Sequence, residues 1–176
     1  MRKIEVMLYE FSELNESAKK RAIERFREII NVEYEWWDCT YDGMAESGII
    51  IREFDMYRGT LESNIDDKYQ TAQTIISDFG EAMELSIISK QFLLDREALV
   101  KKYGEGNQTD GYAVKDEYLN EYDDELDELE SEYHETLNEA MLQFLRDEYE
   151  YLTSDEAVRE SIEINNYEFT EDGKIK

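Results

Sequence analysis

The spacing of apolar residues along the chain is typical of a mostly helical protein. A stripe at intervals of four, four and three residues predicts a first helix that ends near Ile30; its members are Ala18, Ala22, Phe26 and Ile29. Asn15 precedes this stripe and is a favourable N-cap residue. Further helices are predicted over 33–47, over 69–103 with a break at Gly80, and after a capping-box pattern of Thr153 and Glu156.

Shorter segments have strand-like patterns. These segments are 3–11, 49–57, 60–65 and 165–170. In the first, Ile4, Val6 and Leu8 fall on one side. The second and third are predicted to pair as a hairpin around Arg58-Gly59, and the fourth ends at an Asp172-Gly173 turn. We therefore expect an α+β fold: a mostly helical single domain over residues 1–176 with a small antiparallel sheet.

The longest helical pattern covers about residues 112–150. Its apolar positions follow intervals of 4, 4, 3, 4, 4, 3 and 4, and they are Tyr118, Tyr122, Leu126, Leu129, Tyr133, Leu137, Ala140 and Phe144. This is an 11-residue repeat, about 3.67 residues per turn, which is close to the period of an unstrained helix. The pattern predicts one narrow face that stays on the core for about seven turns.

The chain is strongly acidic, and this property bears most on its function. The chain of 176 residues has 45 acidic and 19 basic side chains, a formal net charge of −26. Between 112 and 150 there are 15 acids against Lys115 and Arg146, which is half of that net charge. Such a surface argues against direct binding to nucleic acid, which needs a basic face. No apolar run is long enough for a membrane span, and the N-terminus does not resemble a secretory signal.

The acidic helix allows two interpretations. It is either a solvated surface helix, or a surface that imitates a nucleic-acid backbone and binds a basic groove on another protein. Thirty-nine helical residues span about 58 Å, so the net charge is one per about 4.5 Å, against one per about 1.7 Å in duplex DNA. That density is nearer to a single strand. The candidate partner-binding acids are Asp123, Asp124, Asp127, Glu128, Glu130, Glu132 and Glu135.

Few residues besides these acids suggest a role in binding or catalysis. One indole of Trp36-Trp37 is expected to enter the core while the other stays near the surface, and Trp36 is a candidate partner contact. Cys39 is predicted to fill space in the core, and a dyad with the only histidine, His134, has no support. The sequence shows no glycine-rich phosphate loop, metal-ligand cluster or nucleophile elbow, so we expect no cofactor, no metal site and no catalytic residue.

The loop 104–111 separates two helices. Asp110, Gly111 and Glu117 fit positions 5, 6 and 12 of a calcium loop, but Gly106 at position 1 supplies no carboxylate. We therefore interpret the loop as a connector.

The first helix holds the one basic concentration of the chain: Lys19, Lys20, Arg21, Arg25 and Arg27. These side chains could pair within the helix, for example Lys20 with Glu16 and Arg27 with Glu24. They could instead meet the acidic helix of another copy. A homodimer is therefore an open alternative.

Several segments resemble a group of small acidic proteins encoded by bacteriophages and prophages. The N-terminal ones are Tyr9-Glu10-Phe11-Ser12-Glu13-Leu14, Ser17-Ala18-Lys19-Lys20-Arg21-Ala22-Ile23-Glu24, Tyr34-Glu35-Trp36-Trp37-Asp38 and Glu53-Phe54-Asp55 with Arg58-Gly59; the C-terminal ones are Tyr151-Leu152-Thr153-Ser154-Asp155-Glu156-Ala157 and Tyr167-Glu168-Phe169-Thr170-Glu171-Asp172-Gly173. The resemblance implies action in a bacterial host cytoplasm during infection or lysogeny. The resemblance implies no functional residues, because we know of no catalytic motif in this group.

Charge and context together give a leading hypothesis of a non-enzymatic inhibitor of a host defence complex. By analogy with anti-CRISPR and anti-restriction proteins, it would occupy a basic, nucleic-acid-binding surface of a host protein. The alternative is an antitoxin-like or structural interaction module that binds one protein through Trp36, with the acidity serving solubility. A hydrolase that uses carboxylates and a divalent metal is a third and weaker alternative.

Overall fold

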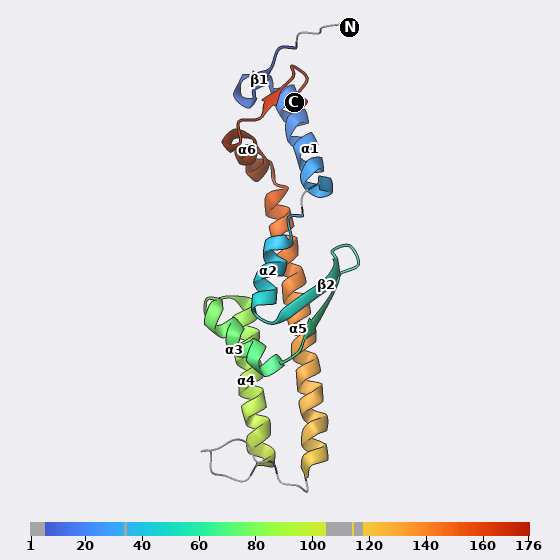
Figure 1. Cartoon of the computed structure of the whole chain (residues 1–176), viewed down its shortest axis with the longest axis vertical. Helices are drawn as coiled ribbons and strands as arrows, with labels where there is room; N and C mark the ends of the chain where they lie inside the picture. The colour runs from blue at the N-terminus through green and yellow to red at the C-terminus, as the bar shows by residue number, and fades with distance from the viewer. Residues whose placement is uncertain (1–5, 34, 105–113, 115–117) are drawn as a thin grey trace. The chain divides into compact units, whose positions relative to one another are not determined.

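The structure is a computed structural model that describes residues 6–33, 35–104, 114 and 118–176. It has the expected α+β, mostly helical fold (Figure 1). In chain order, the elements are β1 (Tyr9–Glu10), the short 3-10 helix η1 (Phe11–Glu13), α1 (Glu16–Glu33), α2 (Asp38–Glu46), β2 (Ile49–Asp55), β3 (Thr60–Ile65), α3 (Lys68–Asp78), α4 (Glu84–Tyr103), α5 (Leu119–Leu152), α6 (Asp155–Ile164) and β4 (Glu168–Phe169).

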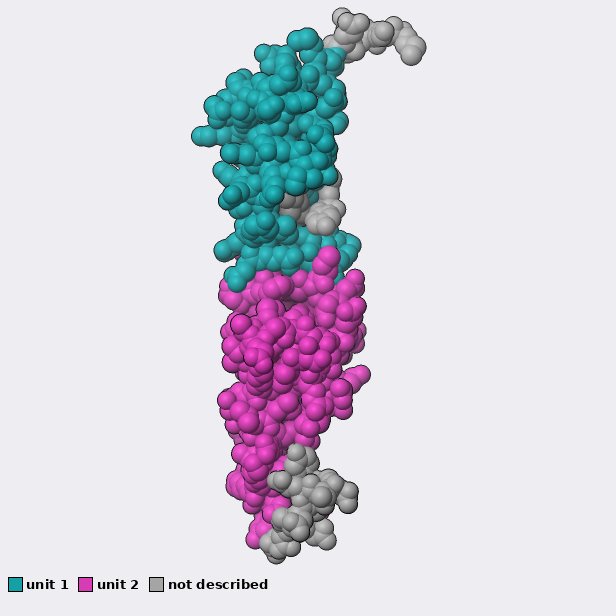
Figure 2. All heavy atoms as spheres, turned by 90° about the vertical axis from the view of Figure 1, so that its left-hand side faces the viewer, with its two compact units in different colours: residues 1–38, 146–176 teal, residues 39–145 magenta. Residues whose placement is uncertain are grey.

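The chain groups into two compact units (Figure 2). Unit 1 contains Met1–Asp38 and Arg146–Lys176, and unit 2 contains Cys39–Leu145. Helix α5 contributes to both, with residues 119–145 in unit 2 and 146–152 in unit 1. The expectation of a single domain stays a prediction.

Unit 1 is built around one face of α1. Asn15 caps the helix as expected, since its Oδ1 accepts a hydrogen bond of 2.9 Å from the backbone N–H of Ala18. The core joins both ends of the chain and consists of Phe11, Leu14, Ala18, Ala22, Ile23, Phe26, Val158, Ile162 and Phe169. Ile29, which the sequence pattern predicted on the same apolar face, is 36% exposed. The helix α6 that supplies two core residues is capped by Ser154, one residue later than predicted.

The strand predicted over 3–11 is mostly wrong where the structure describes it. Only Tyr9–Glu10 forms a strand, and it pairs antiparallel with β4 at the far end of the sequence. Val6 and Leu8 are 50% and 40% exposed, so the alternation in this segment does not correspond to a buried face. Ile4 lies outside the described residues.

The C-terminal loop of unit 1 packs directly on α1. Gly173 adopts a φ of +78°, as a turn glycine does, and a Cβ atom at this position would lie 2.4 Å from the carbonyl oxygen of Ala18. Only glycine therefore allows this close approach. It brings the neighbouring carbonyl of Asp172 to the basic face of α1.

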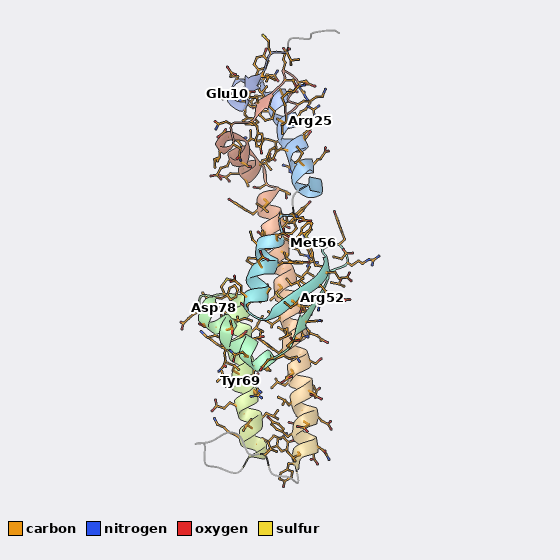
Figure 3. The ribbon with its side chains drawn as sticks, viewed as in Figure 1. Glu10, Arg25, Arg52, Met56, Tyr69 and Asp78 are labelled. Carbon is orange, nitrogen blue, oxygen red and sulfur yellow. The ribbon has the colours of Figure 1, made fainter. Side chains whose placement is uncertain are left out.

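Unit 2 begins with the predicted hairpin. Strands β2 and β3 pair antiparallel from Ile49↔Ile65 to Asp55↔Thr60, with an irregularity in register between Ile51 and Glu53. The turn is fixed by Asp55, whose Oδ1 accepts hydrogen bonds of 2.9 Å from the backbone N–H groups of Tyr57 and Arg58. Figure 3 labels Arg52 and Met56 on this hairpin. The hairpin is separate from the β1–β4 pair, so the strands form two small sheets.

Two helices of unit 2, α4 and α5, lie side by side (Figure 1). The ring of Phe92 on α4 stacks on Tyr133 of α5 with centroids 4.1 Å apart. The hydroxyl of Tyr133 hydrogen-bonds Ser89 at 2.9 Å, and burial raises the pKa of Tyr133 to about 12. The predicted break at Gly80 is confirmed by the end of α3 at Asp78 and the start of α4 at Glu84.

The core face of α5 departs from the predicted 11-residue repeat toward the end of unit 2. Tyr133, Leu137 and Ala140 are buried as expected, whereas Phe144 is 42% exposed. The buried residues that follow are Met141, Leu142 and Leu145. Because these residues point in several directions around the helix, this part of α5 is enclosed on more than one side.

Candidate functional site

The exposed side of α5 carries a regular row of carboxylates. Its members follow intervals of 3, 4, 4, 3 and 4 residues, so they share one face of the helix. We call these residues the acidic row: Glu121, Asp124, Glu128, Glu132, Glu135 and Glu139. All six are exposed, and none forms an ion pair with another described residue. The row therefore presents about one uncompensated carboxylate per helical turn.

Two further acids widen the row. Asp123 and Asp127 are exposed on the neighbouring face of α5, and they also lack an ion pair within the described part of the chain. The eight acids from Glu121 to Glu139 span about 27 Å along the helix axis, so their mean spacing over seven intervals is about 3.9 Å per charge. One strand of duplex DNA carries one phosphate per about 3.4 Å of helix axis. No lysine or arginine lies in α5 before Arg146.

The other acids of this segment are compensated inside unit 2. Glu130, a predicted partner contact, is half-buried and lies 3.3 Å from Nζ of Lys68. Glu125 accepts hydrogen bonds from Lys102 at 2.6 Å and from the hydroxyl of Tyr103 at 2.7 Å. These contacts, the one from Lys102 first, hold the pKa of Glu125 below its ordinary value and raise the pKa of Lys102. Both acids therefore link α5 to other helices.

The sequence prediction and the acidic row overlap in part. Of the seven predicted acids, four belong to the row, Asp123 and Asp127 flank it, and Glu130 is paired with Lys68. Glu121 and Glu139 were missed. Both could have been found from the sequence, because they lie three and four residues from Asp124 and Glu135 and so continue the spacing of the row.

Trp36 lies in a different environment from the acids. It is 5% exposed, and its ring contacts Trp37 with centroids 5.6 Å apart and Tyr149 with centroids 5.5 Å apart. It is therefore the indole that enters a core, whereas Trp37 is half-buried. Within this chain Trp36 offers little surface to a partner.

The basic face of α1 is used within unit 1. The guanidinium groups of Arg21 and Arg25 donate to the carbonyl oxygen of Asp172 at 3.0 Å and 3.2 Å. Figure 3 labels Arg25 on this helix. Arg27 donates to the carbonyl oxygen of Thr153 at 2.6 Å and pairs with Asp155. The predicted intrahelical partner of Arg27, Glu24, is thus replaced by contacts with α6 and the end of α5.

Neither Cys39 nor His134 forms part of a nucleophilic pair. Cys39 is exposed, so its predicted place in the core is wrong. His134 instead hydrogen-bonds the hydroxyl of Ser63 through Nε2 at 2.9 Å. Because the Ser63 hydroxyl donates its proton to Oδ1 of Asn138 at 2.6 Å, Nε2 of His134 must act as the donor. A histidine that donates cannot deprotonate the serine, and Ser63 is only 8% exposed.

The surroundings of His134 shift its pKa. Burial, and then the nearby Lys68, lower the pKa of His134 below its ordinary value. With Ser63 and Asn138, the ring forms a polar cluster that joins β3 to α5.

Metal binding has no built site in the described residues. No group of three or more histidine, cysteine, aspartate or glutamate side chains gathers there as a metal-binding cluster. The calcium-loop alternative falls on Gly106, Asp110, Gly111 and Glu117, which lie outside the described residues.

The comparisons with known proteins add no family. No protein-family model, no curated protein and no solved structure matches this chain. The resemblance to small acidic phage proteins therefore stays a prediction. Among the described helices, none is both long enough and apolar enough to span a membrane.

Proposed function

We propose that this chain is a non-enzymatic binding protein that uses the acidic row to occupy a basic, nucleic-acid-binding surface of another protein. The observation that carries the proposal is the set of six exposed carboxylates that have no ion pair among the described residues. Holding like charges along one face costs free energy through mutual repulsion. A basic partner removes that cost when it binds.

The spacing of the charges supports this kind of partner. Together with Asp123 and Asp127, the row has about one charge per 3.9 Å of helix axis, close to the one phosphate per about 3.4 Å along one strand of duplex DNA. The row therefore fits a groove that binds a single strand, or the half of a duplex site that contacts one strand. Association with a basic protein would be fast and sensitive to salt.

The biological setting we propose is inhibition of a bacterial defence complex in the host cytoplasm. It rests on the resemblance to small acidic phage proteins and on the charge of the chain. The alternative module centred on Trp36 is less favoured, because this side chain is 5% exposed. The hydrolase that uses carboxylates and a divalent metal is also less favoured, because no three of the described histidine, cysteine, aspartate and glutamate side chains gather as a metal-binding group.

A matched pair of variants tests the proposal. The row variant neutralises all six acids: Glu121→Gln, Asp124→Asn, Glu128→Gln, Glu132→Gln, Glu135→Gln and Glu139→Gln. The unit 1 control variant removes the same charge from six exposed acids elsewhere: Glu24→Gln, Glu28→Gln, Glu160→Gln, Glu163→Gln, Glu168→Gln and Glu171→Gln.

Tagged forms of the three proteins are used to capture proteins from a bacterial lysate, followed by mass spectrometry. We expect the wild type and the unit 1 control to retain a basic nucleic-acid-binding protein, which elutes as salt rises, and the row variant to lose it. Equal retention by the two variants would contradict the proposal, because acidity in general would then explain the binding.

A further inference from the structure

Helix α4 carries an exposed stripe with a different pattern from the acidic row. Its members follow intervals of 3, 4, 3, 4 and 3 residues, which is the 3.5-residue period of a coiled-coil seam. We call these residues the α4 stripe: Glu84, Ile87, Gln91, Leu94, Ala98 and Lys101. All six are exposed, and the side of unit 2 on which α4 lies faces the viewer in Figure 2.

The stripe has a charged residue at each end and two large apolar residues, Ile87 and Leu94, between them. Ile87 is 56% exposed and Leu94 is 58% exposed, although α4 buries Leu85, Phe92 and Leu99 on its other face. Gln91 lies between the two apolar residues, and its amide donates to the carboxylate of Asp95 at 2.9 Å and 3.0 Å. A polar residue at the centre of such a seam restricts register and orientation.

The order of residues in the α4 stripe is complementary to itself when the helix is reversed. In an antiparallel pair, Glu84 lies opposite Lys101 of the second copy, Ile87 opposite Ala98, and Gln91 opposite Leu94. Each large residue meets a small or flexible one, and each charged end meets the opposite charge. A parallel pair would instead place Glu84 against Glu84 and Lys101 against Lys101.

The residues beside the stripe agree with this arrangement. Lys90 and Glu97 lie on the same flank of α4, each one position before a stripe residue. Within the chain, Lys90 lies 3.8 Å from Glu81, and Glu97 lies 2.6 Å from Lys101. In the antiparallel pair, Lys90 of one copy lies opposite Glu97 of the other, so these exposed contacts within the chain are exchanged for contacts between copies. Helix dipoles also favour this orientation, because the C-terminal end of one helix meets the N-terminal end of the other.

The local charge of α4 permits two copies to meet there. The whole chain has a net charge of −26, which opposes self-association. Helix α4, however, has three acidic and four basic residues, whereas α5 has thirteen acidic residues and one arginine. The α4 stripe is thus a place where two strongly acidic chains can touch without bringing like charges together.

We propose that a second copy of this chain docks on the α4 stripe, in an antiparallel homodimer with a two-fold axis between Gln91 and Leu94. A seam of one helix about 26 Å long is at the small end for protein interfaces. The dimer should therefore dissociate in the micromolar range. The inference is independent of the proposed function, since it concerns another helix and its test needs no other protein.

Sedimentation equilibrium at about 0.15 M salt, where repulsion between distant charges is screened, tests whether the dimer forms. The wild type should approach twice its mass of 21.0 kDa as its concentration rises to a few hundred micromolar. Leu94→Asp should weaken dimerisation about tenfold or more without changing the circular dichroism, because Leu94 is exposed. A wild type that stays monomeric, or a Leu94→Asp variant that dimerises equally, would overturn the proposal.

A charge swap tests the pairing of the ends. Glu84→Lys and Lys101→Glu should each weaken the dimer, and the double variant should restore part of the loss, because the attraction between the ends is rebuilt with reversed sign while the contact of Lys101 with Glu97 stays broken. If the two single variants dimerise as the wild type does, or if their effects add in the double variant, the antiparallel contact is wrong.

Disulfide capture gives the orientation directly. Ile87→Cys and Ala98→Cys are made separately in a Cys39→Ser background and mixed under oxidising conditions. We expect a disulfide between the two different variants and little between identical ones. Cross-linking of Ile87→Cys with itself would indicate a parallel pair and overturn the proposal.

Discussion

Helices α1 and α5 carry the two concentrations of charge in the chain, and they use them in opposite ways. The arginines of α1 bind groups of their own unit: Arg21 and Arg25 contact the carbonyl of Asp172, and Arg27 contacts Thr153 and Asp155. The acidic row of α5 has no such compensation among the described residues. Charges that are paired inside the fold hold it together, whereas charges left exposed cost stability and remain free for a partner.

Helix α5 itself contains both acids that are paired inside the fold and acids that are left unpaired among the described residues. Glu125 and Glu130 are paired with Lys102 and Lys68, so they serve the structure of unit 2. The six acids of the row form no ion pair with those lysines. Substitutions on the two helices should therefore affect stability and binding separately.

The largest effect is expected from Gly173→Ala, which displaces the loop that pairs with α1. The new Cβ atom would lie 2.4 Å from the carbonyl oxygen of Ala18, and the φ of +78° is strained for alanine. We expect a loss of about 2–4 kcal/mol in the stability of unit 1. Tryptophan fluorescence during urea unfolding is the readout, because Trp36 and Trp37 both belong to unit 1.

The control for this variant is Gly80→Ala, since a Cβ atom there would meet nothing within 4 Å. It should change the stability of the chain by about 0.5 kcal/mol or less. If Gly173→Ala were equally mild, the close packing of the C-terminal loop on α1 would be wrong.

A smaller loss is expected from Arg27→Ala. Arg27 donates to the carbonyl oxygen of Thr153 at 2.6 Å and pairs with the exposed carboxylate of Asp155. Because the guanidinium is partly exposed, we expect a loss of about 1–2 kcal/mol by the same fluorescence measurement. Lys20→Ala, an exposed position on the same helix, should change stability by less than about 0.5 kcal/mol. Equal effects at both positions would show that Arg27 is not a specific link.

The carboxylate of Asp172 should make unit 1 sensitive to acid. Hydrogen bonds from Lys174 and then Thr170 lower the pKa of Asp172 to about 2, from an ordinary value near 3.8. A depressed pKa stabilises the folded state above the ordinary value, and this stabilisation is lost as pH falls toward 2. Wild type should therefore be more stable than Asp172→Asn above about pH 4, with the difference vanishing near pH 2. A difference that is constant over this pH range would argue against a role for the carboxylate charge.

The smallest effect on stability is expected from the row variant. Its six substitutions remove no ion pair between described residues and relieve repulsion along one face of α5. The melting temperature should stay the same or rise slightly, measured by circular dichroism. A clear fall in melting temperature would mean that the acidic row stabilises the fold, and its proposed role as a free surface would lose its main support.

Local sequence patterns predicted the helices, strands and turns better than they predicted which side chains are buried. Asn15 as an N-cap, the hairpin around Arg58-Gly59 and the break at Gly80 depend on a few neighbouring residues, and all are confirmed. Cys39 was placed in the core and is exposed, because no neighbouring residue determines on which side of a short helix a small side chain lies.

Long-range contacts were the main source of error. The partners of Arg27 lie more than 120 residues away in the sequence, so the spacing of charges in α1 could not indicate them. The acids of α5 were identified as a group, but separating Glu130 from the row required knowing where Lys68 lies. The regular spacing of Glu121 and Glu139 with the others was available from the sequence alone.

A competition measurement tests directly whether the acidic row occupies a nucleic-acid-binding surface. A nucleic acid is bound to the basic protein that the wild type retains from lysate, and its release is followed by fluorescence anisotropy as each form of the chain is added. We predict release by the wild type and by the unit 1 control variant, and at least about tenfold weaker release by the row variant. Release by the row variant at wild-type concentrations would contradict the account.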